Sequence, residues 1–230
     1  MSTAREISAP PLTPVHDAMT CPWALAERVR TSPDAPLISR KSSVGGRWRE
    51  MSARAFHDQV RQVAAGLAAR GLGPGDAIAI MAHTSYEWTL IDFAAWEAGL
   101  VVVPIYETSS AEQARWIITD AAVRLVVVED AAMETVLTTL AATAPELDEL
   151  QVLSIAKGAV TDLMAAGASA DSAADADLDA RSGRLRSTDL ATIVYTSGTT
   201  GRPKGVELTH GNLIHLSVNA VAHVPEVLRA

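Results

Sequence analysis

The stretch "AIAIMAHTSYEWTLIDFAAWEAGLVVVPI", residues 77–105, decides the fold class. It begins and ends with short apolar runs, over 77–81 and 100–105, and a helix-like segment that Gly99 stops lies between them. Continuously apolar runs of this length are typical of strands that are buried on both faces of a parallel sheet. The order strand, helix, strand therefore predicts a βαβ unit.

The same alternation continues toward the C-terminus. Helices are expected over 109–122 and 131–142, and strands over 124–128 and 150–155. Strands over 190–195 and 205–209 then enclose a polar loop, and Thr209 can cap a helix that begins near Asn212. Strands that alternate with helices predict an α/β fold, with a largely parallel sheet flanked by helices on both faces.

On the N-terminal side, the sequence predicts a hairpin and a long helix. Two short extended runs, 37–40 and 47–49, surround Gly45 and Gly46, which is a hairpin signal. Ser52 can cap the helix that follows, and Gly71 ends it.

The segment Tyr106–Ser110 follows the strand over 100–105. Open α/β sheets bind ligands beyond the carboxyl ends of their strands. Ser109 and Glu112 have capping-box spacing, so a helix-capping role is favoured here over a ligand contact.

Composition narrows the possible function classes. The chain has 230 residues, of which 48% are hydrophobic and 20% charged, as in globular proteins. The net charge of −8 argues against non-specific nucleic-acid binding, which depends on a basic surface. The single cysteine, Cys21, excludes an internal disulfide and fits a cytoplasmic location. No apolar run reaches the ~18 residues of a membrane span, so a soluble protein is expected, with peripheral membrane contact left open.

The domain organisation is expected to be simple. Residues 1–18 are interpreted as a flexible arm, and residues 19–230 as part of one domain. Within it, the Ala-, Asp- and Ser-rich segment 157–187 is interpreted as a linker with one or two small surface helices. Its acidic residues are interpreted as a solvated face: Asp171, Asp175, Asp177 and Asp179.

The polar loop lies within "YTSGTTGRPKGVELTH", residues 195–210. Its glycines allow backbone conformations closed to other residues and a close approach to a ligand. Its hydroxyl groups donate hydrogen bonds, and two basic residues add positive charge, a combination that suits polyphosphate oxygens. The residues concerned are Thr196, Ser197, Gly198, Thr199, Thr200, Gly201, Arg202, Lys204 and Gly205.

The loop fits neither of two common nucleotide-binding motifs. A Walker A loop ends in Gly-Lys-Ser/Thr and opens into a helix, whereas here Pro203 precedes Lys204 and a strand-like segment follows. No G-x-G-x-x-G dinucleotide fingerprint follows the first strand of the alternation. A flexible linker is also disfavoured, because linkers seldom combine hydroxyls and a Pro-Lys pair with tight apolar flanks.

The loop resembles the signature phosphate loop of the AMP-forming, adenylate-forming enzymes, which include acyl-CoA synthetases, luciferases and the adenylation domains of peptide synthetases. A second stretch, "YEWTLIDFAAWEAGLVVVPIYETSSAEQARWIITD", residues 86–120, resembles the N-terminal part of bacterial long-chain fatty-acid–CoA ligases. The resemblance extends from about Trp23 onward and is weakest over 157–187.

The resemblance implies a two-step reaction that uses ATP, Mg²⁺ and coenzyme A. A fatty-acid carboxylate attacks the α-phosphate of ATP to give acyl-AMP and pyrophosphate, and the thiol of coenzyme A then displaces AMP. The resemblance also implies that Lys204 is the catalytic residue in this chain and that it holds the β- and γ-phosphates with the loop donors. The implied cofactor-binding residues are Thr196, Ser197, Gly198, Thr199, Thr200, Gly201, Lys204 and Gly205.

The chain departs from this family in length, because the family's enzymes are more than twice as long. No stretch matches the family's aromatic-Gly-x-Thr-Glu segment, ribose-binding Asp, hinge or C-terminal domain with its adenylation lysine. We therefore expect an incomplete N-terminal part that is inactive by itself and associates through exposed apolar surface. Two alternatives stay open: an enzyme that activates an aryl or amino acid, and a non-catalytic nucleotide-binding module.

The remaining candidate residues carry weaker signals. No histidine pair has the i, i+4 spacing of a helical zinc site, so no metal site built from protein side chains is expected. His210 ends the loop motif and is expected either to touch phosphate or to cap a helix. Trp88, Trp96 and Trp116 lie on expected helices and are interpreted as core residues.

Overall fold

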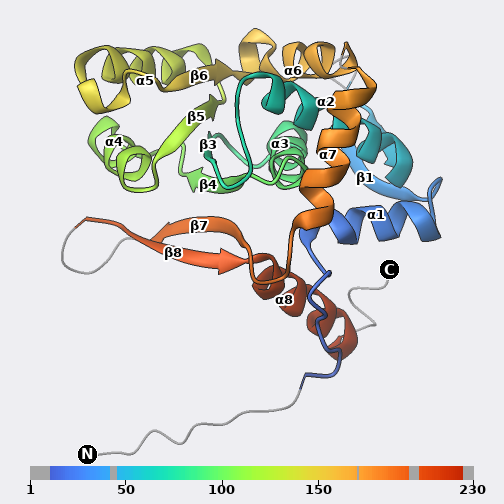
Figure 1. Cartoon of the computed structure of the whole chain (residues 1–230). Helices are drawn as coiled ribbons and strands as arrows, with labels where there is room; N and C mark the ends of the chain where they lie inside the picture. Colours follow the sequence, from blue (N-terminus) through green and yellow to red (C-terminus); the bar gives the residue numbers. More distant parts are fainter. Residues whose placement is uncertain (1–10, 42–45, 170, 197–201, 225–230) are drawn as a thin grey trace, which may run out of the picture.

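The computed structural model describes residues 11–41, 46–169, 171–196 and 202–224 (Figure 1). The helices are α1 (Cys21–Thr31), α2 (Ala53–Ala69), α3 (Tyr86–Glu97), α4 (Ala111–Asp120), α5 (Ala131–Thr143), α6 (Ala159–Ala168), α7 (Ser172–Arg184) and α8 (His210–His223), with short 3-10 helices η1 (Pro145–Leu147) and η2 (Ile155–Lys157). The strands are β1 (Pro36–Lys41), β2 (Trp48–Ser52), β3 (Ala77–Met81), β4 (Val101–Ile105), β5 (Val123–Val128), β6 (Gln151–Ser154), β7 (Leu190–Thr196) and β8 (Lys204–Thr209).

The main sheet has the strand order β6-β5-β3-β4-β7-β8. The strands from β6 to β7 in this order run parallel to one another, and β8 runs antiparallel to β7 at the edge. β1 and β2 form a separate antiparallel hairpin. The predicted hairpin and the largely parallel sheet are therefore confirmed.

The central strand β3 has apolar cores on both of its faces. Ile78 and Ile80 belong to a core that includes residues of α2 and α3, whereas Ala77 and Ala79 belong to a core with α4 and α5. Successive side chains of a strand point to opposite faces, so a sheet covered on both faces requires continuously apolar strands. Figure 1 shows α4 and α5 away from α2 and α7, with β3 and β5 between them. The predicted helical cover of both faces is confirmed.

Two helices, α2 and α8, begin at the predicted capping residues. The Ser52 hydroxyl accepts from the N–H of Ala55 at the start of α2, with 3.2 Å between oxygen and nitrogen. Thr209 and Asn212 form a capping box at the start of α8. Both starts are as the sequence predicts.

The predicted capping box of α4 was wrong by one residue. Ser110 with Gln113 forms the box, in place of Ser109 with Glu112. The N–H of Ser109 instead donates to the carbonyl of Tyr106, which closes a turn and leaves Ser110 as the last extended residue. Spacing alone could not separate two adjacent serines that each have a polar residue three positions later.

Residues 157–187 contain the expected helices, α6 and α7. α6 packs closely on α2, because a methyl group at Gly167 would lie only 1.9 Å from the carbonyl oxygen of Gln62. Leu163 of α6 and Leu178 of α7 are buried in the core. Both helices therefore pack on the core more closely than a solvated connector would. Sequence rich in Ala and Gly is found in exposed linkers, but it also permits close packing between helices.

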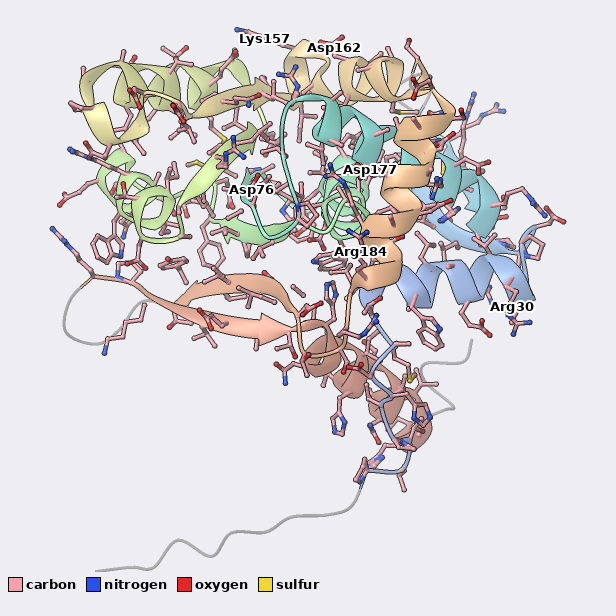
Figure 2. The ribbon with its side chains drawn as sticks, viewed as in Figure 1. Arg30, Asp76, Lys157, Asp162, Asp177 and Arg184 are labelled. Carbon is pink, nitrogen blue, oxygen red and sulfur yellow. The ribbon has the colours of Figure 1, made fainter. Side chains whose placement is uncertain are left out.

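The acidic residues of α7 are exposed, as interpreted, but several have partners. Arg61 of α2 forms ion pairs with Asp179 at 2.8 Å and with Asp175 at 3.5 Å. Asp177, which projects from α7 in Figure 2, pairs with Arg181.

Among the described residues, no helix is both long and apolar enough to cross a bilayer.

Candidate phosphate-binding site

The motif residues lie at one end of a two-stranded ribbon. β7 ends at Thr196 and β8 begins at Lys204, and these two residues are direct partners in the antiparallel register. Both are exposed. The register therefore brings together a hydroxyl and an ammonium group that are eight positions apart in the sequence. The predicted residues between them, Ser197, Gly198, Thr199, Thr200 and Gly201, lie outside the described residues.

The ribbon end belongs to the edge of the sheet where α/β proteins bind ligands. β7 runs parallel to β4, so the carboxyl ends of both strands meet at one edge. Open α/β sheets bind ligands outside this edge. The segment after β4 lies at the same edge: Tyr106 is 72% exposed, and Ser110 caps α4.

Trp116 of α4 fixes the β8 side of the ribbon end. Its indole N–H donates to the carbonyl oxygen of Pro203, with 2.9 Å between nitrogen and oxygen. The guanidinium carbon of Arg202 lies 4.6 Å from the centre of the Trp116 ring, a cation–π contact. One half-buried side chain thus holds two residues directly before Lys204.

Asp120 of α4 fixes the β7 side. The Tyr195 hydroxyl donates to the Asp120 carboxylate, with 2.6 Å between the oxygens. Burial, together with this hydrogen bond and the carboxylate's charge, raises the pKa of Tyr195. Tyr195 therefore stays a protonated donor at neutral pH. Trp116 and Asp120 are four positions apart, one helical turn, so a single face of α4 contacts both sides of the ribbon end.

Sequence reasoning missed the contacts that Trp116 and Asp120 make with the ribbon. Trp116 was interpreted as a core residue, and no role was assigned to Asp120. Their partners lie 87 and 75 positions away, which no local pattern reveals. One signal was available in the sequence. A tryptophan and an aspartate four positions apart on an amphipathic helix lie on the same face, where both can contact a neighbouring element.

Gly205 has a packing reason for its lack of a side chain. A methyl group at this position would lie 2.8 Å from Cγ2 of Ile193 and 3.1 Å from the Tyr195 ring, on the facing strand. Glycine here lets β8 lie close to β7 and to the Tyr195 ring. The contact of Gly205 with a ligand stays a prediction.

His210 does not cap α8, because the Thr209 side chain does so. The His210 ring is buried, and its Nδ1 accepts from the N–H of Cys21, with 3.3 Å between the nitrogens. Burial lowers the pKa of His210 to about 4, so the ring is neutral at neutral pH. It therefore ties the start of α8 to the start of α1. The expected phosphate contact stays untested.

Trp96 is a core residue, as predicted. It is buried, its ring packs edge-on against His210, and its indole N–H donates to the carbonyl of Ala191 at 2.9 Å. This bond joins α3 to β7. Trp88 is half-buried and packs against the same core.

The described part of the site suits the oxygens of a multiply charged anion. Thr196 offers a hydroxyl, and Arg202 and Lys204 offer positive charge, all exposed at one end of the ribbon. The described residues contain no group of three or more His, Cys, Asp or Glu side chains that could hold a metal ion. The described residues at this end of the ribbon therefore offer a hydrogen-bond donor and positive charge, and they form no carboxylate metal cage.

Comparisons with known proteins identify the family. The model of the family described as "AMP-binding enzyme" matches residues 25–229. The chain belongs to this family. Within this AMP-binding family, the chain is 41% identical over 226 residues to the long-chain-fatty-acid–CoA ligase FadD15 of Mycobacterium bovis. This match covers 98% of the chain but 37% of FadD15, so the chain spans little more than a third of that relative's length.

Solved structures of other proteins have the same fold. The chain is similar to a fatty acyl CoA synthetase of Mycobacterium tuberculosis, with a TM-score of 0.65 and 23% identity over 84% of this chain and 35% of the other. It is also similar to McyG A-PCP complexed with phenylalanyl-adenylate, with a TM-score of 0.71 and 19% identity over 93% and 36% of the two chains. At these identities the likeness concerns the fold alone.

Proposed function

We propose that this chain contributes the phosphate-binding part of a long-chain fatty-acid–CoA ligase. The observation that carries the proposal is the ribbon end, where Thr196 and Lys204 face each other and α4 holds both sides. The 41% identity to FadD15 along nearly the whole chain supports the choice of a fatty acid as the activated substrate.

In the proposed reaction, a fatty-acid carboxylate oxygen bonds to the α-phosphorus of ATP. The bond from this phosphorus to the oxygen that bridges to the β-phosphate breaks, and pyrophosphate leaves. The thiol of coenzyme A then attacks the acyl carbon, and AMP leaves. No protein nucleophile is required, so catalysis depends on positioning and on neutralising negative charge.

The chain's own residues have defined tasks in this proposal. Lys204 places its ammonium group against the β- and γ-phosphate oxygens and stabilises the charge that collects on pyrophosphate as it leaves. The hydroxyl of Thr196 donates to a phosphate oxygen, as do Ser197, Thr199 and Thr200 of the loop. Gly198, Gly201 and Gly205 allow the backbone to come close to these oxygens.

ATP, coenzyme A and Mg²⁺ are the cofactors of the proposed reaction. Mg²⁺ neutralises phosphate charge when it is bound. The described residues offer it no carboxylate cluster, so they do not fit a protein-built magnesium site.

Two further functions remain candidates beside this one. The second is an enzyme that activates an aryl or amino acid, a function that the same fold also accommodates, since McyG was solved with phenylalanyl-adenylate. A non-catalytic nucleotide-binding module is the third. Because the chain spans 37% of FadD15, we expect the 230 residues alone to bind phosphates without completing the reaction.

The proposed phosphate role is tested by titrating the chain with pyrophosphate in an isothermal calorimeter. The chain has three lysines, so Lys157→Ala is a matched control for Lys204→Ala. We expect Lys204→Ala to weaken pyrophosphate binding about tenfold, and Lys157→Ala to leave it unchanged. Equal affinities for both variants would contradict the role of Lys204.

Self-association is the second expected property of the chain. Large apolar side chains are exposed on β8 and α8, among them Val206 at 45% and Leu216 at 70%. Exposed apolar surface of this kind favours association. We expect sedimentation velocity to show dimers or larger species at high concentration, and Leu216→Glu to shift them toward monomer. A purely monomeric wild-type chain would contradict this expectation.

A further inference from the structure

A groove separate from the phosphate-binding ribbon lies between the β1–β2 hairpin and the N-terminal end of α3. Its volume is about 720 Å³, within the usual range of small-molecule sites. The lining residues used below are Arg40, Lys41, Trp48, Arg49, Tyr86 and Glu87. None of them belongs to the motif around the phosphate loop.

The groove has the opposite charge to the chain as a whole. Three cations line it, Arg40, Lys41 and Arg49, against one carboxylate, Glu87. The chain carries a net charge of −8. Arg40 and Arg49 are direct partners in the register of the hairpin. Like charges placed directly opposite each other destabilise an antiparallel pair. An anion bound between the two guanidinium groups would relieve this repulsion.

The protein itself compensates this charge poorly. Arg40 and Glu87 form an ion pair at 3.9 Å between two substantially exposed side chains, a contact that contributes little. Neither Lys41 nor Arg49 forms an ion pair with any residue that the structure describes. Residues 42–45, which follow Lys41 in the sequence, include no acidic residue.

Aromatic rings hold two of the cations in place. The guanidinium carbon of Arg40 lies 4.6 Å from the centre of the Tyr86 ring, and the Lys41 ammonium lies 5.6 Å from the Trp48 ring. The Tyr86 hydroxyl donates to Gln59 at 2.7 Å, which fixes its ring. Trp48 is 66% exposed and so offers an apolar surface beside the cations. The positive groups are thus partly ordered before any ligand binds.

We propose that this groove binds a phosphate-bearing anion. Arg40 and Arg49 present planar guanidinium groups whose paired N–H donors match the geometry of phosphate oxygens. The groove exceeds the size of one phosphate, and the exposed face of Trp48 contacts the organic group that the phosphate carries. Two sources supply this chemistry: the headgroups of an anionic phospholipid surface, and a soluble phosphate ester.

The test uses the 230-residue chain and two probes. Sedimentation with vesicles of phosphatidylcholine, with or without phosphatidylglycerol, measures binding to headgroups, and calorimetric titration with ADP measures binding of a soluble phosphate ester. The groove variant is Arg40→Gln/Arg49→Gln. The matched control, Arg70→Gln/Arg184→Gln, removes the same charge from exposed positions outside the groove; Arg184 projects from α7 in Figure 2.

We expect one probe to bind the wild-type chain, with affinity reduced about tenfold or more in the groove variant and unchanged in the control. The probe that responds identifies the source of the phosphate. Lys204→Ala distinguishes ADP bound in the groove from ADP bound at the proposed phosphate loop. Binding at the loop is lost in Lys204→Ala and kept in the groove variant. The single variant Arg49→Gln, whose side chain has no ion pair among the described residues, serves if the double variant melts early.

Three results overturn the proposal. The first is that neither probe binds the wild-type chain. The second is that the groove and control variants lose binding equally, which indicates non-specific charge. The third is ADP binding that depends on Lys204 alone, without vesicle binding. Since none of these readouts involves fatty-acid activation, the groove and the proposed ligase function succeed or fail independently.

Discussion

The indole N–H of Trp116 donates to the carbonyl oxygen of Pro203, a residue 87 positions later in the chain, with 2.9 Å between nitrogen and oxygen. One turn further along α4, Asp120 accepts from the hydroxyl of Tyr195. These two contacts hold the chain on both sides of the loop that is proposed to bind phosphate. The position of Lys204 therefore depends on a helix that is distant in sequence.

The first prediction concerns Trp116. Trp116→Phe keeps an aromatic ring under Arg202 but removes the donor to Pro203. Loss of such a hydrogen bond costs about 1 kcal/mol. We expect faster amide hydrogen exchange in peptides that cover 202–209, measured by mass spectrometry.

The matched control is Trp88→Phe, on the half-buried face of α3, away from the ribbon. It should leave exchange over 202–209 unchanged. If Trp116→Phe also leaves exchange there unchanged, the indole does not hold this side of the ribbon.

The second prediction concerns Tyr195 and Asp120. Each of Tyr195→Phe and Asp120→Asn alters a 2.6 Å bond between a hydroxyl and a carboxylate. Hydrogen bonds to charged groups contribute roughly 1.5–3 kcal/mol. We expect Tyr195→Phe to lower the free energy of unfolding by about that amount, measured by urea denaturation.

A double-mutant cycle separates this pair from other effects of the two substitutions. The double variant should be less destabilised than the sum of the single variants, because the second change removes a bond that is already lost. Simple additivity would show that the two groups do not interact in solution.

The third prediction concerns the pH dependence of stability. Asp92 is buried in α3, and burial raises its pKa to about 7. An unfolded aspartate has a pKa of about 3.9. Between these values the folded state holds a proton that the unfolded state has lost, so this contribution to stability is lost as pH rises from about 4 to about 7.

His210 acts in the opposite direction. Its pKa is lowered to about 4, so its contribution to stability is present above the unfolded pKa of about 6.5 and is lost as pH falls toward 4. Asp92→Asn removes one of the two opposing contributions. The free energy of unfolding of the variant minus that of wild type should therefore be about 2–3 kcal/mol larger at pH 7.5 than at pH 5. Urea denaturation at both pH values checks this, and a constant difference between the proteins would refute it.

The sheet could be predicted from the sequence because its signals are local. β3 and β4 are continuously apolar runs, and β5 is apolar except for the exposed Arg124. Each is followed by a helix that a polar residue caps. Burial on both faces requires this pattern. Local signals had lower precision at element ends, as the one-residue error between Ser109 and Ser110 illustrates.

The supports of the candidate site could not be predicted, because they are tertiary contacts. Nothing near Trp116 indicates that its N–H reaches Pro203, and nothing near His210 indicates that its ring accepts from the backbone of Cys21. The close packing of α6 on α2 is similar, since it depends on Gly66 and Gly167 meeting the backbone of the other helix. Composition reveals small residues but not which surface they face.

The central claim is that this chain provides the phosphate-binding part of a fatty-acid–CoA ligase. The most direct test is a chimera in which the chain replaces the matching 226-residue stretch of Mycobacterium bovis FadD15. Exchange of labelled pyrophosphate into ATP, dependent on a long-chain fatty acid, is then measured for the chimera, for its Lys204→Ala variant and for the 230-residue chain alone. The account predicts exchange by the chimera, a reduction of about a hundredfold in the variant, and none by the chain alone. A folded chimera without exchange, or full exchange in the Lys204→Ala variant, would contradict it.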